Sequence, residues 1–226
     1  FSANSRGGAL YIESSGEITF KNVNFHNNFT TGSHDDGGAV SINSVDAVGS
    51  FYNCIFSGNK NQSSSSQGST IHVKGHVNLY GCLFYNNDCY GSYDNGHIYI
   101  DYYGTSHVES CTFSKNIGGQ GVIFYDGDVS TMINSIIYDN SSTYSIYDDG
   151  YDEIFIKNCL YESYFGSDFI FQGGNLQNID PIFVNSNLND FRIQYSSPCR
   201  NYSTSSLPSH DLNGFNRSTD SSPDMG

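Results

Sequence analysis

One short phrase recurs along this chain and constrains its fold more than any other feature. The phrase is an apolar strand, a small residue, any residue, an aromatic residue, two free positions and then Asn. The small residues of its copies are Val23, Cys54, Cys82, Cys111, Ser135 and, in a decayed copy without the Asn, Cys159. The steps between copies are 31, 28, 29, 24 and 24 residues. A drifting period of this size with strand-like content predicts a solenoid whose loops differ in length.

Two further phrases divide each period into short strands. Gly-Gly followed by alternating apolar residues occurs at 7–12 and 37–42, with weaker echoes at 68–73, 96–100 and 121–124. Gly permits the turn, and the alternation predicts a strand with one buried face. Another strand precedes several of the small residues, at 18–20, 77–79 and 154–156. Each period therefore holds about three short strands, and no segment shows the 3.6-residue period of a helix.

Stacking such strands in parallel gives each backbone group a partner one coil away, at a spacing of ~4.8 Å. Equivalent residues then lie above one another in columns. We expect inward columns of Cys54, Cys82 and Cys111 and of Phe25, Phe56, Phe84 and Phe113. A further column is expected from Asn28, Asn59, Asn87, Asn116 and Asn140. Because Asn carries both donors and an acceptor, this column can bond along its length and cap each strand at a tight turn.

The composition bounds the partners and the domain organisation. The chain has 226 residues, 24 Gly, 18 Tyr and 16 Phe, but only nine Lys and Arg together, and its formal net charge is −14. Nucleic acid and anionic membranes need clustered Lys and Arg, so the sequence argues against both. No stretch reaches the ~20 apolar residues of a membrane span, which argues against direct membrane insertion. We expect β-helix coils over 1–200 and a tail, 201–226, that packs on or caps the last coil. The chain begins inside a repeat at Phe1, so we expect it to be a piece of a longer one.

These motifs resemble known repeats. The pairing of Gly-Gly-Ala-apolar (7–10 and 37–40) with Phe-x-x-Asn resembles the repeats of the chlamydial polymorphic outer membrane proteins. The second motif begins at Phe1, Phe25, Phe56, Phe84 and Phe113. The C-terminal part resembles a broader family, the right-handed parallel β-helix repeat proteins, at 134–140, 178–184, 190–193, 197–199, 211–217 and 223–226. It departs from that family at 144–153 and at Arg200-Asn201.

The resemblance implies an all-β chain folded as a right-handed parallel β-helix, with about seven to eight coils of three short strands. The family includes adhesins, secreted passenger domains, surface arrays and polysaccharide-active enzymes, so the fold does not decide the function.

Polysaccharide lyases of this fold hold calcium with acidic residues and use a Lys or Arg base. The candidates here are Asp35, Asp36, Asp126, Asp128, Asp148, Asp149 and Asp152, with Lys74 and Lys115 as the nearest bases. Calcium needs about six to eight converging oxygens, whereas Asp is common in Gly-rich turns for conformational reasons. We therefore favour solvated turns.

Other enzyme classes have less support. Galacturonan hydrolases of this fold carry Gly-His-Gly and Arg-x-Lys, and neither string is present; Gly-x-Ser-x-Gly is absent too. His72, His76 and His97 could approach one another and bind a metal, but their spacing gives no motif, and ordinary stacking roles are favoured. The sequence thus predicts no catalytic residue, no metal ligand and no cofactor, and it leans against an enzyme.

The six Cys residues leave disulfide pairing open. Neighbours in a column lie within disulfide range, but their Cβ atoms point the same way, which favours free thiols for Cys54, Cys82 and Cys111. Cys89 with Cys82 and Cys159 with Cys199 remain alternatives. The tyrosines at 99, 102, 103 and 125 could stack on sugars, although packing on strand faces is favoured.

Five Asn-x-Ser/Thr sequons, at Asn28, Asn61, Asn140, Asn201 and Asn216, favour a secretory route and an extracellular or cell-surface location. An inward Asn cannot carry a glycan, so Asn61, Asn201 and Asn216 are expected to be better acceptors than the ladder residues Asn28 and Asn140. We expect a non-enzymatic structural or adhesive module that associates with itself or with other surface proteins, with a surface filament or array as one form. The alternative is a domain that binds or cleaves polysaccharide.

Overall fold

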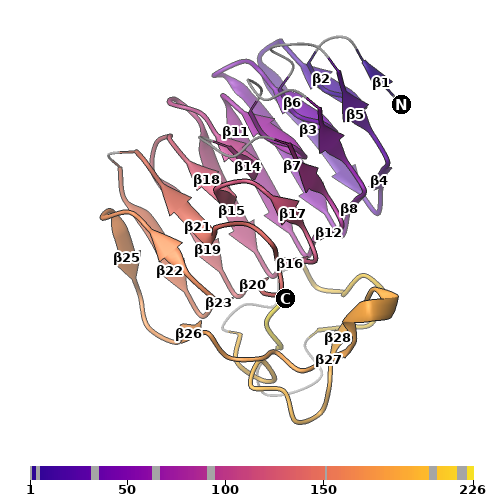
Figure 1. Ribbon diagram of the computed structural model, residues 1–226, viewed down its shortest axis with the longest axis vertical. Coiled ribbons are helices and arrows are strands. Elements are labelled where there is room, and N and C mark those ends of the chain that lie inside the picture. The colour runs from indigo at the N-terminus through magenta and orange to yellow at the C-terminus, as the bar shows by residue number, and fades with distance from the viewer. Residues whose placement is uncertain are drawn as a thin grey trace.

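The computed structural model describes residues 2–3, 6–31, 36–62, 67–90, 95–150, 152–203, 208–217 and 223–226. The chain winds into an all-β parallel solenoid, with strands of successive coils stacked side by side from the N-terminal end to β25 (Figure 1). The predicted fold class is confirmed. No helix in this described part is long and apolar enough to cross a membrane.

Four parallel sheets run along the stack. Sheet A contains β1 (Ser2–Ala3), β5 (Phe29–Thr30), β9 (Lys60–Asn61), β13 (Asp88–Cys89) and β17 (Ile117–Gly118). Sheet B contains β2 (Leu10–Ile12), β6 (Val40–Ile42), β10 (Ile71–Val73), β14 (Gly96–Ile100), β18 (Gly121–Tyr125), β21 (Tyr144–Asp148) and β24 (Tyr164–Phe165). Sheet C contains β3 (Gly16–Lys21), β7 (Ala47–Tyr52), β11 (His76–Tyr80), β15 (Thr105–Glu109), β19 (Ser130–Ile133), β22 (Ile154–Lys157) and β25 (Phe169–Phe171). Sheet D contains β4 (Asn24–His26), β8 (Ile55–Ser57), β12 (Leu83–Tyr85), β16 (Thr112–Ser114), β20 (Ile136–Ile137), β23 (Leu160–Tyr161) and β26 (Leu176–Gln177).

The coil count differs slightly from the expected seven to eight coils of three strands. Sheets B, C and D each hold seven strands, while sheet A holds five. Each early coil therefore has a fourth short strand that follows the Asn turn, as β5 follows β4. Its two residues are too few to show the alternation by which the longer strands were recognised in the sequence.

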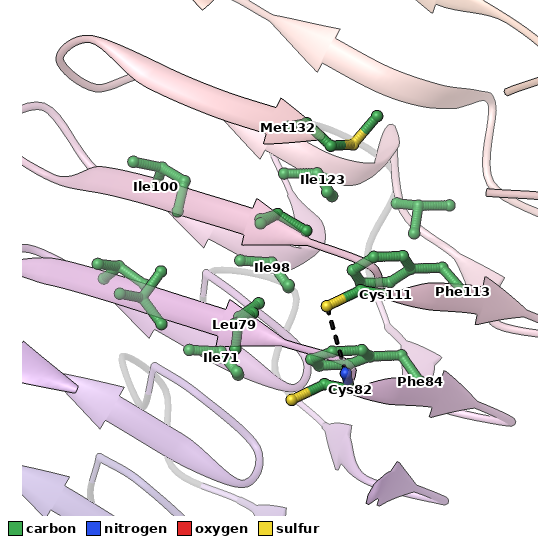
Figure 2. Close-up of a cluster of buried hydrophobic side chains, with 14 of the residues drawn as sticks. Ile71, Leu79, Cys82, Phe84, Ile98, Ile100, Cys111, Phe113, Ile123 and Met132 are labelled. Carbon is green, nitrogen blue, oxygen red and sulfur yellow. Dashed lines mark hydrogen bonds between the residues drawn. The ribbon is translucent and has the colours of Figure 1, made fainter. Parts of the chain in front are cut away.

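Aromatic and sulfur columns fill the core. The rings of Phe25, Phe56, Phe84 and Phe113 stack at centroid distances of 4.8, 4.5 and 4.6 Å. The side chains of Cys54, Cys82 and Cys111 are buried beside them. Figure 2 shows Phe113 above Phe84 and Cys111 above Cys82, where the Cys82 N–H donates to Cys111 Sγ at 3.4 Å. These columns remove large apolar surfaces from water in every coil.

The Asn column forms a continuous hydrogen-bonded ladder. Each Nδ2 donates to the Oδ1 of the next coil: Asn28 to Asn59 at 2.9 Å, Asn59 to Asn87 at 3.0 Å, Asn87 to Asn116 at 2.9 Å and Asn116 to Asn140 at 2.9 Å. Each accepting Oδ1 also takes the backbone N–H of the Asn one coil before, as Asn87 does from Asn59 at 2.9 Å. The ladder thus satisfies both side-chain and backbone groups of the turn between sheets D and A.

The Gly-Gly phrase has a steric cause. The first Gly has a left-handed backbone, with φ of 70° at Gly7 and 74° at Gly37. The second Gly packs against the next coil, because a Cβ at Gly38 would lie 2.1 Å from the carbonyl oxygen of Ser69. Only Gly fits both positions without moving the backbone of the neighbouring coil.

The coils end at β26, and the rest of the chain leaves the stack. Strands β27 (Phe183–Asn185) and β28 (Asp190–Ile193) form an antiparallel hairpin around a 3-10 turn, η1 (Ser186–Leu188). The tail then runs along the side of sheet D (Figure 1). Asn53 Nδ2 donates to the carbonyl of His210 at 3.2 Å, and the Gly226 N–H donates to the carbonyl of Asn134 at 2.8 Å.

This arrangement corrects the expected boundary of the coils at residue 200. After Gln177 the hairpin strands pair with each other and not with β26. The described part of the tail lies against the flank of several coils, because its bonds reach Asn53 and Asn134, which belong to coils far apart in the stack.

Replacing Asn87 by Ala is expected to destabilise the protein by at least about 2 kcal/mol, since each buried group left without a partner costs ~1–3 kcal/mol. The groups affected are the Asn59 N–H and the Phe56 carbonyl. Urea unfolding followed by circular dichroism measures the change. The matched control is Asn24→Ala, an exposed Asn in the same phrase, which is expected to shift stability by less than about 0.5 kcal/mol. Equal effects of the two substitutions would contradict the role of the ladder.

Candidate functional site

Polar and aromatic side chains gather on the outer face of sheet B, so this face is the first candidate for a site. One outward column contains Ser41, His72, Tyr99, Phe124, Tyr147 and Phe165. The rings stack, at 4.9 Å from Tyr99 to Phe124 and 4.7 Å from Phe124 to Tyr147. All except Phe165 are buried. The column is therefore a second packed stack on the outside of the sheet, and not an open binding face.

A small charged cluster lies where sheet B turns into sheet C. The Asp101 Oδ2 atom lies 3.3 Å from His72 Nε2 and 3.6 Å from Lys74 Nζ. Burial opposes the charge of Asp101, but His72, the Tyr102 N–H and Lys74 outweigh it and lower the pKa of this carboxyl group. His72 is fully buried. Asp101 is thus held as a paired carboxylate, which makes it a poor general base.

The other acidic candidates serve their own turns. Asp126 accepts a hydrogen bond from Tyr99 Oη at 3.1 Å, and Asp128 accepts the Val129 N–H at 2.9 Å. Asp148 accepts the Gly150 N–H at 3.0 Å. Burial raises the pKa of Asp148 and outweighs the backbone hydrogen bonds that it accepts, which lower the pKa. The bonds of Asp128 and Asp148 are the turn contacts for which Asp is common, whereas that of Asp126 joins neighbouring coils.

The remaining candidates do not converge. Asp36 accepts the Gln67 N–H and lies 3.7 Å from Arg6, while Asp149 and Asp152 are exposed. Lys115 pairs with Asp139 at 2.6 Å at the turn between sheets D and A, away from the sheet B turns. Asp35 lies outside the described residues. Among the residues that the structure describes, no three His, Cys, Asp or Glu side chains are placed to hold a metal ion.

The three histidines singled out in the sequence lie on two faces. His76, on sheet C, contacts Thr105 Oγ1 and Asn78 Oδ1. His72 and His97 belong to sheet B, where His97 Nδ1 lies 2.8 Å from Ser69 Oγ. Burial lowers the pKa of His97 to about 3, against a small opposing contribution from the Gly118 backbone. His97 is therefore a neutral, buried ring.

All six cysteines are free and buried, so both disulfide alternatives are wrong. Cys89 lies in sheet A with its Sγ atom 3.8 Å from the Gly96 carbonyl, and Cys159 Sγ lies 3.4 Å from the Met132 carbonyl. Burial raises the pKa of Cys89, Cys159 and Cys199 to about 12 each. These thiols are protonated at neutral pH and are poor nucleophiles.

The four tyrosines divide into two pairs. Tyr99 and Tyr125 are buried in the sheet. Tyr102 and Tyr103 are 61% and 66% exposed, with their rings perpendicular at 4.8 Å. Their turn is fixed by Asp101 Oδ1, which accepts the Tyr102 N–H at 2.8 Å. This pair alone among the four presents its rings to solvent.

A cavity of about 580 Å³ lies between the outer face of sheet D and the tail. Its floor includes Leu83 and Ile136, and its far wall includes Phe191 and Arg217. Desolvation lowers the pKa of Arg217, which donates to the Gly226 carbonyl at 2.8 Å. The guanidinium group therefore joins two parts of the tail, while the Gly226 N–H binds the stack at the Asn134 carbonyl.

The sequons differ in exposure. Asn201 and Asn216 are exposed, whereas Asn140 is half-buried, with its amide engaged in the ladder. Asn28 and Asn61 are both buried. This corrects the preference for Asn61 as an acceptor, because Asn61 belongs to β9 and is covered inside sheet A.

Sequence reasoning missed Asp101 and the pair of His107 and Glu109, whose Nε2 and Oε2 atoms lie 3.0 Å apart. Asp101 follows the last residue of β14 as Lys74 follows the last residue of β10. Aligning the periods at the ends of these strands would have placed the two side chains together.

Comparison with known proteins concerns the fold. A family model described as "Right handed beta helix region" matches residues 4–188. No curated protein and no solved structure matches the chain.

Replacing His97 by Gln is expected to make the protein less sensitive to acid. An unfolded His takes up a proton below its ordinary pKa of about 6.5, whereas folded His97 stays neutral down to about pH 3. The contribution of His97 to the free energy of unfolding is therefore complete above pH ~6.5. It is lost as the pH falls toward ~3, by up to about 5 kcal/mol. Urea unfolding at about pH 7, 5 and 4 measures how steeply the free energy of unfolding falls with pH. The control is His210→Gln, an exposed His, and parallel slopes in wild type and H97Q would refute the neutral buried ring.

Proposed function

The chain belongs to the family of right-handed beta helix proteins, and on that premise we propose that it is a non-enzymatic structural or adhesive module located outside the cell or on its surface. The observation that carries the proposal is that the repeated polar groups at two of the turns are engaged with the protein itself. The Asn ladder binds its own turn backbone, Asp101 is paired with Lys74, and His72 is sealed from solvent. Such a surface repeats one scaffold along its length, and in the part of the chain that the structure describes no three His, Cys, Asp or Glu side chains are grouped to hold a metal ion.

An extracellular setting is supported by two features. The sequons Asn201 and Asn216 are exposed on the tail. The Gly-Gly-Ala and Phe-x-x-Asn phrases resemble the repeats of the chlamydial polymorphic outer membrane proteins, and they form the turns and the aromatic column. A net charge of −14 also favours solubility over binding to anionic polymers.

One observation favours a second candidate, a polysaccharide-binding domain. Tyr102 and Tyr103 stand exposed on a turn that Asp101 holds in place. Exposed aromatic rings beside a carboxylate suit a sugar, whose C–H groups pack on the ring while its hydroxyl groups donate to the carboxylate. This candidate differs from the first in requiring a soluble glycan ligand.

A panel of pectins, alginates and related polymers, incubated with the protein with and without calcium, distinguishes the candidates. We expect no new chain ends above a protein-free blank, because the described acidic candidates do not converge and Asp36, Asp126, Asp128 and Asp148 already accept hydrogen bonds. Cleavage of any polymer would overturn the proposal. Binding without cleavage that is lost in Tyr102→Ala/Tyr103→Ala, but kept in the exposed control Tyr195→Ala, would replace it with the second candidate.

Secretion from eukaryotic cells tests the exposed sequons. We expect glycans on Asn201 and Asn216 of the folded protein and none on Asn28 or Asn61, because a glycan on a buried Asn prevents the coil from closing. Intact-glycopeptide mass spectrometry reads the occupancy of each site, and Asn201→Gln and Asn216→Gln should each remove one glycan. A glycan on Asn61 of folded protein would contradict its burial.

A further inference from the structure

Exposed apolar side chains gather where the chain turns from sheet B to sheet C. We call this edge the B–C corner and define it as residues 43–46, 74–75, 101–104, 126–129, 149–150 and 152–153. Val45, Tyr102, Tyr103 and Val129 of the corner are 58%, 61%, 66% and 46% exposed. A single exposed apolar residue is ordinary, whereas four on the turns of one edge mark a surface for a partner.

Backbone pairing continues from sheet B into the B–C corner and stacks its turns. The Asp101 N–H donates to the Val73 carbonyl of the previous coil at 2.8 Å, and the Asp126 N–H donates to the Ile100 carbonyl at 2.9 Å. Since coils are ~4.8 Å apart, the four steps from the turn after β6 to the turn after β21 span ~19 Å. An extended peptide of about six residues covers that length.

The B–C corner is also strongly acidic. Lys74 is the single Lys or Arg within the ranges that define the corner, and its Nζ atom lies 3.6 Å from Asp101 Oδ2. The corner therefore presents net negative charge to a partner. Its exposed carboxylates are those of Asp46, Asp128, Asp149, Asp152 and Glu153.

We propose that the B–C corner docks an extended, Arg-rich segment of a partner protein. The inference rests on the proposed adhesive function and names the chemistry of the partner that such a module holds. Opposite charge steers the segment to the corner, and each guanidinium group pairs with an exposed carboxylate. The apolar stems of the Arg side chains pack on Val45 and Val129.

The exposed tyrosines distinguish this partner from a metal ion and from a neutral sugar. The rings of Tyr102 and Tyr103 are perpendicular to each other, so each offers a separate face to a guanidinium group. A metal ion makes no use of these rings, and a neutral glycan brings no charge to compensate the carboxylates. Arg meets both features, because its planar cation stacks on aromatic faces and forms ion pairs with carboxylates.

Fluorescence anisotropy with a labelled peptide of alternating Arg and Ser tests the proposal. A length of about twelve residues is twice the span of the corner. A peptide of alternating Gln and Ser is the matched uncharged probe. The aromatic variant is Tyr102→Ser/Tyr103→Ser, and its control is Tyr90→Ser/Tyr195→Ser, which removes two exposed tyrosines outside the corner.

A second pair of variants tests the charge. The charge variant is Asp149→Asn/Asp152→Asn, and its control is Asp88→Asn/Asp180→Asn, which removes two exposed carboxylates outside the corner. Circular dichroism melts establish that each variant is folded.

The Arg peptide is expected to bind wild type and both controls, more weakly as salt rises from about 50 to 300 mM, and the Gln peptide is expected not to bind. Each corner variant is expected to weaken binding of the Arg peptide about tenfold. Equal binding of the two peptides, or unchanged binding in either corner variant, would overturn the inference.

The other ligands are told apart in the same samples. Calcium binding without peptide binding, or glycan binding without peptide binding that the aromatic variant abolishes, would assign the corner to another ligand and overturn the inference. Failure of the Arg peptide to bind leaves the proposed function standing, whereas polymer cleavage would remove that function without changing the anisotropy of the peptide.

Discussion

Hydrogen bonds from each strand to the strand one coil away hold this molecule together and decide where every side chain lies. Parallel pairing keeps the register from β3 to β7, β11 and β15 without a slip. Residues that recur in the sequence therefore meet in space. The stacked Phe rings and the bonded Asn amides are both consequences of that register. A shift of one residue would turn both columns to the opposite face.

The fold was predictable where a residue type recurs at a fixed place in the period. Phe84 lies between Phe56 and Phe113 because all three occupy the same position of the phrase. Asn61 shows the limit, since β9 has two polar residues and no alternation by which sheet A could be recognised. The path of the tail depends on contacts between residues far apart in the sequence, such as Asn53 and His210, which no local pattern encodes.

The candidate site was harder to predict than the fold, because the same residue types serve turns and chemistry. Asp128 and Asp148 looked like ligands in the sequence, yet each accepts backbone N–H groups of its own turn. Asp101 was not among the acidic candidates, although it contacts both His72 and Lys74. These carboxylates differ in the side chains that the neighbouring coil places beside them. Which side chains those are depends on the lengths of the loops, and these lengths vary from coil to coil.

The buried cysteines bear on the surroundings in which this scaffold can persist. All six thiols are unlinked and buried in the protein. No disulfide closes the coils, so a reducing environment has none to break, and an oxidising one meets only buried sulfur atoms. The same structure can therefore exist in reducing and in oxidising surroundings. Its stability comes from packing and hydrogen bonds between the coils and not from disulfides.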